Sequence, residues 1–464
     1  MVEADFSFAD RQQPDRITAF TAKYKVQEND PTDDAKRIND QLFAENIAVS
    51  CRKKKATLLS VTTAEKTTPP PLPYNLIKLQ ADAARKFGFD LNYTLDITQS
   101  LREKHKLITY NRSDCQYLSD EQHADAALVL SAVKNTAPLF TAAIGHTQTS
   151  LKSRAFNSKK VSAHHAIVPT EAQADFTSLS ADEQKIYLLI ARAYIAQFYP
   201  NYVYDQTKIE VGVDHHVFQT TVNVMKQEGW KALYRNDKDN PELSDDEQEQ
   251  LDLRHLQAQE SGICTDSRSI QKETQPPKAY TMDTLALDLT SVAKYVKNPE
   301  LRQILKDKDK GKEGEHGGIG TPATRHTIIE TLFERGYLTK DGKQVISTAL
   351  GQQFYDQLPD LAKYPDLTAL WHQQQLEIET HDDVIRFINE INRTIEHEVS
   401  RIKSSPSIIE VGIHQCPTCS KPLRRISGSK GFFWGCTAYK DGCKFSCSDE
   451  KGQPMLDPAA IPSK

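Results

Sequence analysis

The chain has 464 residues, of which 38% are hydrophobic and 26% charged, and its formal net charge is −5. A chain of this length is too long to fold around a single hydrophobic core, which predicts three or four structural units. No apolar run approaches the roughly 20 residues of a membrane span, and residues 1–20 lack the apolar stretch of a secretory signal. These features argue against a membrane partner and predict a cytoplasmic protein.

Charge is spread unevenly along the chain. Residues 401–464 carry ten Lys or Arg against five Asp or Glu, so this tail is positive and the remainder more negative than the total suggests. The run at 236–250 holds seven acids and predicts a solvated loop. A negative net charge is therefore compatible with a locally basic groove that binds nucleic acid.

The first predicted elements are two strands around a helix. Residues 17–26 (ITAFTAKYKV) alternate as a strand does, residues 33–47 have helical spacing, and residues 56–65 again favour a strand. The prolines of 67–73 (TTPPPLP) predict an extended segment, because proline restricts its own φ and the residue before it. We interpret this segment as a domain boundary.

Helices dominate the next part of the chain. Residues 74–90 predict a helix with Gly88 as its C-terminal cap, whereas residues 94–106 have only loose helical spacing. Residues 180–199 predict a strong helix, because a Ser-x-x-Glu capping box at 180–183 precedes its apolar face.

The pattern then changes from strand to helix. Residues 202–235 alternate as strands, and residues 274–296 restart helical structure after a pair of prolines. Residues 321–338 predict a helix with Thr321 as N-cap and Pro322 at the first helical position.

Five of the eight cysteines lie in the last 50 residues, which favours a metal site in a reducing compartment over a disulfide framework. Cys416 and Cys419 form one close pair, and Cys436 and Cys443 form a second one further along. Two such thiolate pairs can close a tetrahedral Zn²⁺ site of the zinc-ribbon type. Cys447 is a fifth thiol that could replace Cys443 as a ligand.

Cations and aromatic rings lie close together between the two cysteine pairs: Arg424, Arg425, Lys430, Phe432, Phe433 and Trp434. This combination suits single-stranded nucleic acid, since cations hold the phosphates and aromatic rings stack on the bases. An equally good interpretation is that the aromatic rings form the small core of the ribbon.

One tyrosine stands out in LITYNRSDCQYLSD (107–120). Tyr110 follows a short apolar run and is followed two residues later by Arg112. A phenol, with a pKa of about 10, is a poor nucleophile unless charge or a base assists it. An arginine at this spacing could bind a phosphate through two hydrogen bonds and stabilise the transition state. From this stretch alone a packing role is more common, and Tyr117 is an equally plausible nucleophile.

Two further motifs can contact anions. SAHHAIVPT contains the adjacent His164 and His165, which converge poorly on a metal; a structural role is the more common one, and a phosphate contact is the alternative. GGIGTPATR places glycines before a helix N-terminus, which favours anion binding, with Arg325 in the first turn. This second motif lacks the lysine of a P-loop.

Taken together and in this order, these segments resemble the type IA DNA topoisomerases, and most closely the topoisomerase III branch. The resemblance covers about residues 17–400 and is carried by LQADAARKFG, LITYNRSDCQYLSDE, SAHHAIVPT, KIYLLIARAYIAQFYP, TQPPKAYT, GIGTPATRHTIIETLFERGYLTKDG and LPDLAKYPDLTALW. It implies a multidomain α/β fold, mostly α with a β-rich arch domain and a C-terminal zinc ribbon. The implied domains are the first part of the arch (1–70), a helical domain with the tyrosine (71–199), the second part of the arch (200–273), a helical DNA-groove domain (274–400) and the ribbon (405–464).

The resemblance also implies roles for single residues. Tyr110 would attack a phosphodiester of single-stranded or underwound DNA, keep the 5′ phosphate as a phosphotyrosine and release a 3′ hydroxyl, without ATP. Arg112 would position the scissile phosphate, and His164 would assist cleavage. The segment beside the DNA groove would contain three matching residues: Gly320, Thr321 and Arg325. Where the family usually has proline this chain has Asn111, so we expect Tyr110 to be held less rigidly.

The family begins with a Toprim domain whose acids bind Mg²⁺. Residues 1–70 contain no D-x-D-x-E pattern, so we expect the Mg²⁺ ligands to be absent from this chain. Without that metal the phosphate is poorly organised, and we predict that the polypeptide cleaves poorly by itself, unless a separate Toprim-containing chain complements it. The alternative is a catalytically inactive remnant that binds single-stranded DNA.

Overall fold

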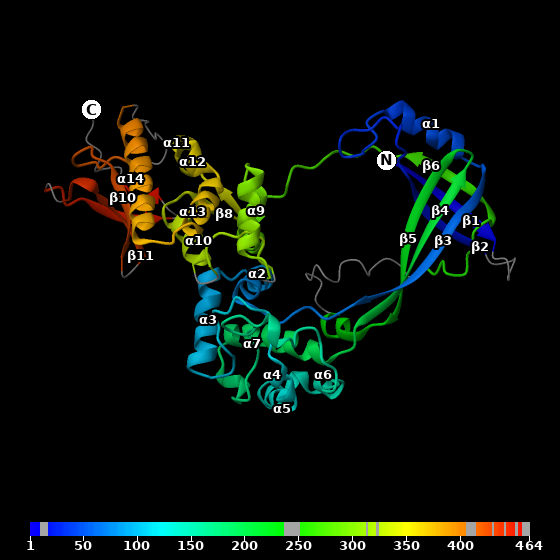
Figure 1. Cartoon of the computed structure of the whole chain (residues 1–464), viewed down its shortest axis with the longest axis horizontal. Coiled ribbons are helices and arrows are strands. Elements are labelled where there is room, and N and C mark those ends of the chain that lie inside the picture. Colours follow the sequence, from blue (N-terminus) through cyan, green and yellow to red (C-terminus); the bar gives the residue numbers. More distant parts are fainter. Residues whose placement is uncertain are drawn as a thin grey trace. The chain divides into compact units, whose positions relative to one another are not determined.

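The structure is a computed structural model that describes residues 1–9, 17–235, 251–311, 314–321, 324–404, 414–428, 431–439, 442–450 and 453–456 (Figure 1). The acidic run 236–250, Pro322 and Lys430 lie outside the described residues. The chain divides into two compact units. The first unit comprises Met1–Leu72, Glu121–Phe156 and Ala191–Lys278, and the second comprises Pro73–Asp120, Asn157–Ile190 and Ala279–Lys464.

The first unit contains a closed barrel of antiparallel strands, in the order β1-β2-β5-β4-β3-β6. The strands are β1 (Val2–Ala9), β2 (Ile17–Tyr24), β3 (Lys55–Thr68), β4 (Tyr202–Val213), β5 (His216–Gln227) and β6 (Ser261–Ser269). Figure 1 shows the long strands β3, β4 and β5 side by side. The strands predicted within 17–26, 56–65 and 202–235 are confirmed. No prediction covered β1 and β6, which pair with each other and close the barrel.

Helix α1 (Gln41–Cys51) buries one face against the barrel core. Its predicted start at residue 33 is wrong. Asp40 is the N-cap, because its carboxylate accepts the Phe43 N–H at 2.9 Å. The carboxylate of Asp33 instead accepts nearby backbone N–H groups and holds residues 33–37 in a turn.

The other α-helices are α2 (Leu76–Phe87), α3 (Leu91–Glu103), α4 (Asp120–Ala124), α5 (Ala126–Thr136), α6 (Thr141–Gly145), α7 (Ala181–Ile195), α8 (Met282–Asp288), α9 (Pro299–Lys308), α10 (Arg325–Glu334), α11 (Ala349–Gln357), α12 (Asp360–Lys363), α13 (Asp366–Leu376) and α14 (His381–Ser404).

The second unit also has two sheets. One has the order β7-β9-β8, with β7 (Tyr280–Thr281), β8 (Leu338–Asp341) and β9 (Gln344–Ser347), and the other has the order β10-β11-β12-β13, with β10 (Leu423–Gly428), β11 (Gly431–Cys436), β12 (Ser446–Glu450) and β13 (Gln453–Pro454). Within the described ranges, no helix is long and apolar enough to cross a membrane.

Capping residues set the ends of the helices in the second unit. Gly88 caps α2 with a left-handed φ of 71°, as predicted. The predicted capping box at the start of α7 is confirmed, since Ser180 N–H donates to Glu183 Oε2 at 2.8 Å. The helix predicted to follow Thr321 directly begins only at Arg325, because the side chain of Thr324 folds back to accept the Thr321 N–H.

Candidate functional site

Hydrogen bonds hold the segment before Tyr110 beside the segment after His164. Thr109 N–H donates to Val168 O at 3.0 Å, and Thr109 Oγ1 donates to Ala166 O at 2.9 Å. A β-bridge between Ile108 and Pro169 continues this pairing. The two motifs that the sequence separates by about 50 residues therefore meet at one place.

Tyr110 is half-buried and lies against two candidate partners. Its ring stacks on the exposed imidazole of His164, with centroids 4.2 Å apart and planes inclined by 30°. The guanidinium carbon of Arg102, in the last turn of α3, lies 4.6 Å from the centroid of the same ring. Arg112 is exposed, and no side-chain hydrogen bond or ion pair of Arg102, Arg112 or His164 occurs among the described residues. The guanidinium N–H groups of Arg102 and the imidazole of His164 are thus available to bind a ligand beside the Tyr110 phenol.

Arg102 carried no prediction from the sequence. It lies eight residues before Tyr110, in a stretch whose helical spacing is loose. Only the folded position of α3 brings its side chain back over the tyrosine ring.

Asn111 is held in place by a buried hydrogen bond, which the expectation of a loosely held Tyr110 did not take into account. Its side chain is 2% exposed, and its amide donates to Thr98 Oγ1 of α3 at 3.2 Å. Thr98 in turn donates to Leu95 O within the helix. Asn111 thus ties the Tyr110 segment to α3.

Tyr117 does not share this setting. Its side chain is 5% exposed, and its hydroxyl accepts a hydrogen bond from Lys160 Nζ at 2.9 Å. A phenol held inside the protein in this way is poorly placed to attack a DNA strand. The two tyrosines that the sequence leaves equivalent are therefore distinguished by burial.

The two adjacent histidines have different surroundings. His164 contacts Tyr110, whereas Nδ1 of the half-buried His165 lies 3.0 Å from Ala166 O. Neither belongs to a group of three or more potential metal ligands in the part of the chain that the structure describes.

A buried carboxylate fixes the last turn of α3 against α7. Glu183 is 8% exposed and accepts hydrogen bonds from Ser100 Oγ at 2.6 Å and from the backbone of Ser180. His105 Nε2 lies 3.3 Å from the same carboxylate. Burial by itself would raise the pKa of Glu183, but these hydrogen bonds and the nearby imidazole lower the pKa to about 2.

We expect Glu183→Gln to destabilise the protein at neutral pH but not in strong acid. Because the folded state lowers the pKa, the carboxylate contributes stability above its unfolded pKa of about 4.3, and this contribution is lost as the pH falls toward 2. The difference in unfolding free energy between wild type and variant should be roughly 3 kcal/mol at pH 7. Urea unfolding at several pH values measures it, and a difference that stays constant down to pH 2 would contradict the assignment.

Arg325 is not presented to solvent as an anion-binding group. It is 1% exposed, and its two terminal nitrogens donate to the two carboxylate oxygens of Glu315, each at 2.6 Å. Nε donates to Ile319 O at 2.9 Å. Arg325 therefore shapes the glycine segment from inside, while Gly320 and Thr321 lie exposed on it.

The glycines of this segment are needed for close packing. Asp309 Oδ2 accepts the N–H groups of Gly317 and Gly318 at 3.1 and 3.0 Å. A Cβ on Gly318 would lie 2.6 Å from Glu315 Oε2 and 2.7 Å from Arg325 Nη2. Any side chain there would displace the ion pair.

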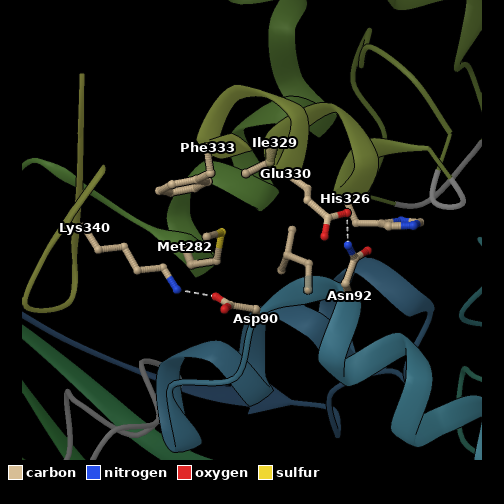
Figure 2. A pocket seen from close by; sticks show the side chains of 9 residues that line it. Asp90, Asn92, Met282, His326, Ile329, Glu330, Phe333 and Lys340 are labelled. Carbon is tan, nitrogen blue, oxygen red and sulfur yellow. Dashed lines mark hydrogen bonds and ion pairs between the residues drawn. The ribbon is translucent and has the colours of Figure 1, made fainter. Parts of the chain in front are cut away.

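A pocket of about 250 Å³ lies between the start of α3 and α10, and Figure 2 shows the side chains around it. An ion pair between Asp90 and Lys340 and a hydrogen bond from Asn92 to Glu330 cross its rim. The apolar walls belong to one packed cluster that joins α3, α8 and α10: Leu91, Met282, Ile329 and Phe333. The helix that carries Arg102 and the helix that begins with Arg325 are thus packed together.

The four predicted zinc ligands converge. The sulfur atoms of Cys416 and Cys443 are 3.7 Å apart, those of Cys419 and Cys436 are 3.4 Å apart, and all four lie within 4.8 Å of one another. Tetrahedral Zn–S bonds of about 2.3 Å place sulfur atoms about 3.8 Å apart, so the residues fit a Zn²⁺ ion. Burial by itself would raise the pKa of the Cys416 thiol, but backbone N–H groups lower it to about 7, which favours the thiolate that binds metal. Cys447 is not part of this group.

The three ribbon side chains expected to bind DNA, those of Arg424, Arg425 and Trp434, differ in burial and in their partners. Trp434 is 8% exposed in the ribbon core, and its Nε1–H donates to Asp449 at 2.8 Å. Arg425 binds the same carboxylate through two nitrogens and lies 3.9 Å from the Phe432 ring centroid. Both side chains therefore build the ribbon, as in the second interpretation of the motif, and only Arg424 of the three is exposed.

We expect Cys416→Ser to lose the bound zinc and unfold the ribbon while the rest of the protein stays folded. Structural Zn²⁺ sites contribute about 10–16 kcal/mol at neutral pH in small modules, more than this small core can replace. Native mass spectrometry should find one zinc ion per wild-type chain and none in the variant. Cys447→Ser is the matched control and should keep the ion; its loss there would show that the ligand set is different.

Comparison with known proteins gives the class. A family model described as DNA topoisomerase matches residues 12–383, and the chain belongs to the type IA DNA topoisomerase family. Full-length topoisomerase I from Thermotoga maritima has a similar fold, with a TM-score of 0.55, 20% sequence identity and coverage of 99% of this chain and 68% of that one.

Three similar curated proteins carry the name DNA topoisomerase 3. DNA topoisomerase 3 of Vibrio cholerae is 36% identical over 406 residues, covering 86% of this chain and 60% of the relative. The Haemophilus influenzae protein of the same name is 35% identical, covering 82% and 58%, and the Bacillus cereus protein is 31% identical, covering 88% and 56%. The chain thus spans less than two thirds of the length of these relatives.

Proposed function

We propose that this chain carries the strand-cleaving tyrosine of a topoisomerase 3-like enzyme that acts on single-stranded or underwound DNA. The observation that carries the proposal is the stack of Tyr110 on His164, with the guanidinium of Arg102 over the tyrosine ring and the exposed Arg112 two residues further along the chain. A phenol with adjacent cations at a half-exposed position suits attack on a phosphodiester.

The reaction is an exchange of esters. The Tyr110 oxygen bonds to phosphorus while the bond from phosphorus to the 3′ oxygen breaks, so one phosphodiester replaces another and ATP is not needed. The phenol gives up one proton and the released 3′ hydroxyl takes up one. His164, in contact with the tyrosine ring, is the group we assign to assist this proton movement, and Arg112 is assigned to hold the scissile phosphate.

Mg²⁺ is the metal that the family resemblance implies for cleavage. When bound it would neutralise charge on the phosphate. The four ribbon cysteines are the one group of potential metal ligands in the described residues, and thiolates suit Zn²⁺ rather than Mg²⁺. No Mg²⁺ ligand is therefore assigned among the described residues.

Covalent capture tests the proposal. The protein is mixed with a 3′-labelled single-stranded oligonucleotide and Mg²⁺, by itself and with a separate Toprim-containing fragment, and then denatured. Label that migrates with this chain in either mixture supports the proposal. Oligonucleotide that binds in a native gel but is never captured would favour the alternative, an inactive protein that binds single-stranded DNA.

A further inference from the structure

We propose that Arg102 is a phosphate-binding residue of the Tyr110 site, whose guanidinium lies over the tyrosine ring and donates hydrogen bonds to a DNA phosphate. This inference rests on the proposed function, because it places a DNA strand at Tyr110. It adds a residue that none of the sequence motifs contains.

The turn that carries Arg102 is firmly anchored. The preceding residue, Leu101, is fully buried, and Ser100 donates to Glu183 of α7 at 2.6 Å. Asn111 ties the other side of the site to the same helix through Thr98. The packing of α3 therefore fixes the backbone position from which Arg102 reaches the ring, with its guanidinium carbon 4.6 Å from the ring centroid.

The chemistry of arginine allows both contacts at once. A guanidinium is planar, so it can lie over an aromatic ring while its five N–H donors point outward in its own plane. Arg102 has no hydrogen bond or ion pair to any described residue, although it is only half-exposed. This differs from Arg325 and Arg425, whose guanidinium groups are each held by a carboxylate.

A purely structural role would be a cation that favours the C-terminal end of α3. That role needs only positive charge near the helix end, which Lys104 also supplies. It gives no reason for the guanidinium to lie on the ring of the proposed nucleophile. A phosphate bound at its edge would lie beside the tyrosine, where the phosphotyrosine forms.

DNA affinity and its salt dependence test this inference without requiring cleavage. The measurements use the full chain with Tyr110→Phe, which keeps the aromatic ring, and a fluorescent single-stranded oligonucleotide. Each phosphate contact adds about 0.7 to the slope of log affinity against log salt. Arg102→Gln should lower the slope by about that amount, and Arg102→Lys should keep most of it. Arg254→Gln is the control, because that guanidinium is already held by Asp205 and Asp252.

Capture assays with Tyr110 present add a second readout. Arg102→Gln should slow adduct formation about tenfold, and Arg102→Lys should also slow it because lysine lacks the planar fork. If the slope falls but no variant forms an adduct, the phosphate site stands and the proposed cleavage fails. An unchanged slope would overturn the inference. Should the glutamine variant not fold, Arg102→Met, which retains the apolar stem, replaces it.

Discussion

Tyr110→Phe should abolish covalent capture of DNA while the protein stays folded and still binds the oligonucleotide. Phenylalanine lacks only the phenolic oxygen, so the ring can still stack on His164 and contact Arg102. No nucleophile remains to form the ester, and capture should fall to background rather than by a few fold. The unfolding free energy should change by about 0.5 kcal/mol or less, since the hydroxyl has no hydrogen bond among the described residues.

Tyr117→Phe is the matched control for this experiment. Its hydroxyl accepts a hydrogen bond from Lys160, so its removal should cost about 1 kcal/mol of stability and leave capture intact. Both variants are compared under the condition in which the wild-type chain is captured. Capture that survives in Tyr110→Phe but is lost in Tyr117→Phe would reassign the nucleophile.

Features encoded by neighbouring residues were predicted well. Gly88 and the capping box at 180–183 are local, because a cap depends on residues within one turn of the helix end. The strands around 17–24 and 202–227 follow from alternation along the chain. The grouping of the four ribbon cysteines was also predicted, since their spacing along the chain restricts how they can meet.

Features that depend on a distant partner were not predicted. Tyr110 and Tyr117 look alike until Lys160, 43 residues further on, is found at the second hydroxyl. Arg325 was predicted to bind an anion because it follows a glycine segment at the start of a helix. Its pairing with Glu315 was not predicted, because Glu315 lies in a segment with no clear periodicity. Trp434 was predicted to stack on bases, but its indole nitrogen donates to Asp449 and its ring is buried in the ribbon. In each case burial and pairing, and not residue type, decide whether the side chain is free to bind DNA.

Arg325→Ala is expected to lower the unfolding free energy of the second unit by about 3–5 kcal/mol. The change leaves the carboxylate of Glu315, which is 9% exposed, without its cation, and it removes the hydrogen bond to Ile319 O. Glu315→Ala should cost a similar amount for the same reason, because a buried charge is left without its partner. Urea unfolding followed by circular dichroism measures both values.

The double variant Arg325→Met with Glu315→Gln separates the pair from its surroundings. It removes both charges together and keeps most of the volume, so it should cost less than the sum of the two alanine variants. Costs that simply add would show that the two side chains act independently. Coupled costs, together with unchanged oligonucleotide affinity of the folded double variant, would mean that Arg325 supports the glycine segment without contacting DNA. A loss of affinity in that folded variant would instead restore Arg325 to the DNA-binding residues.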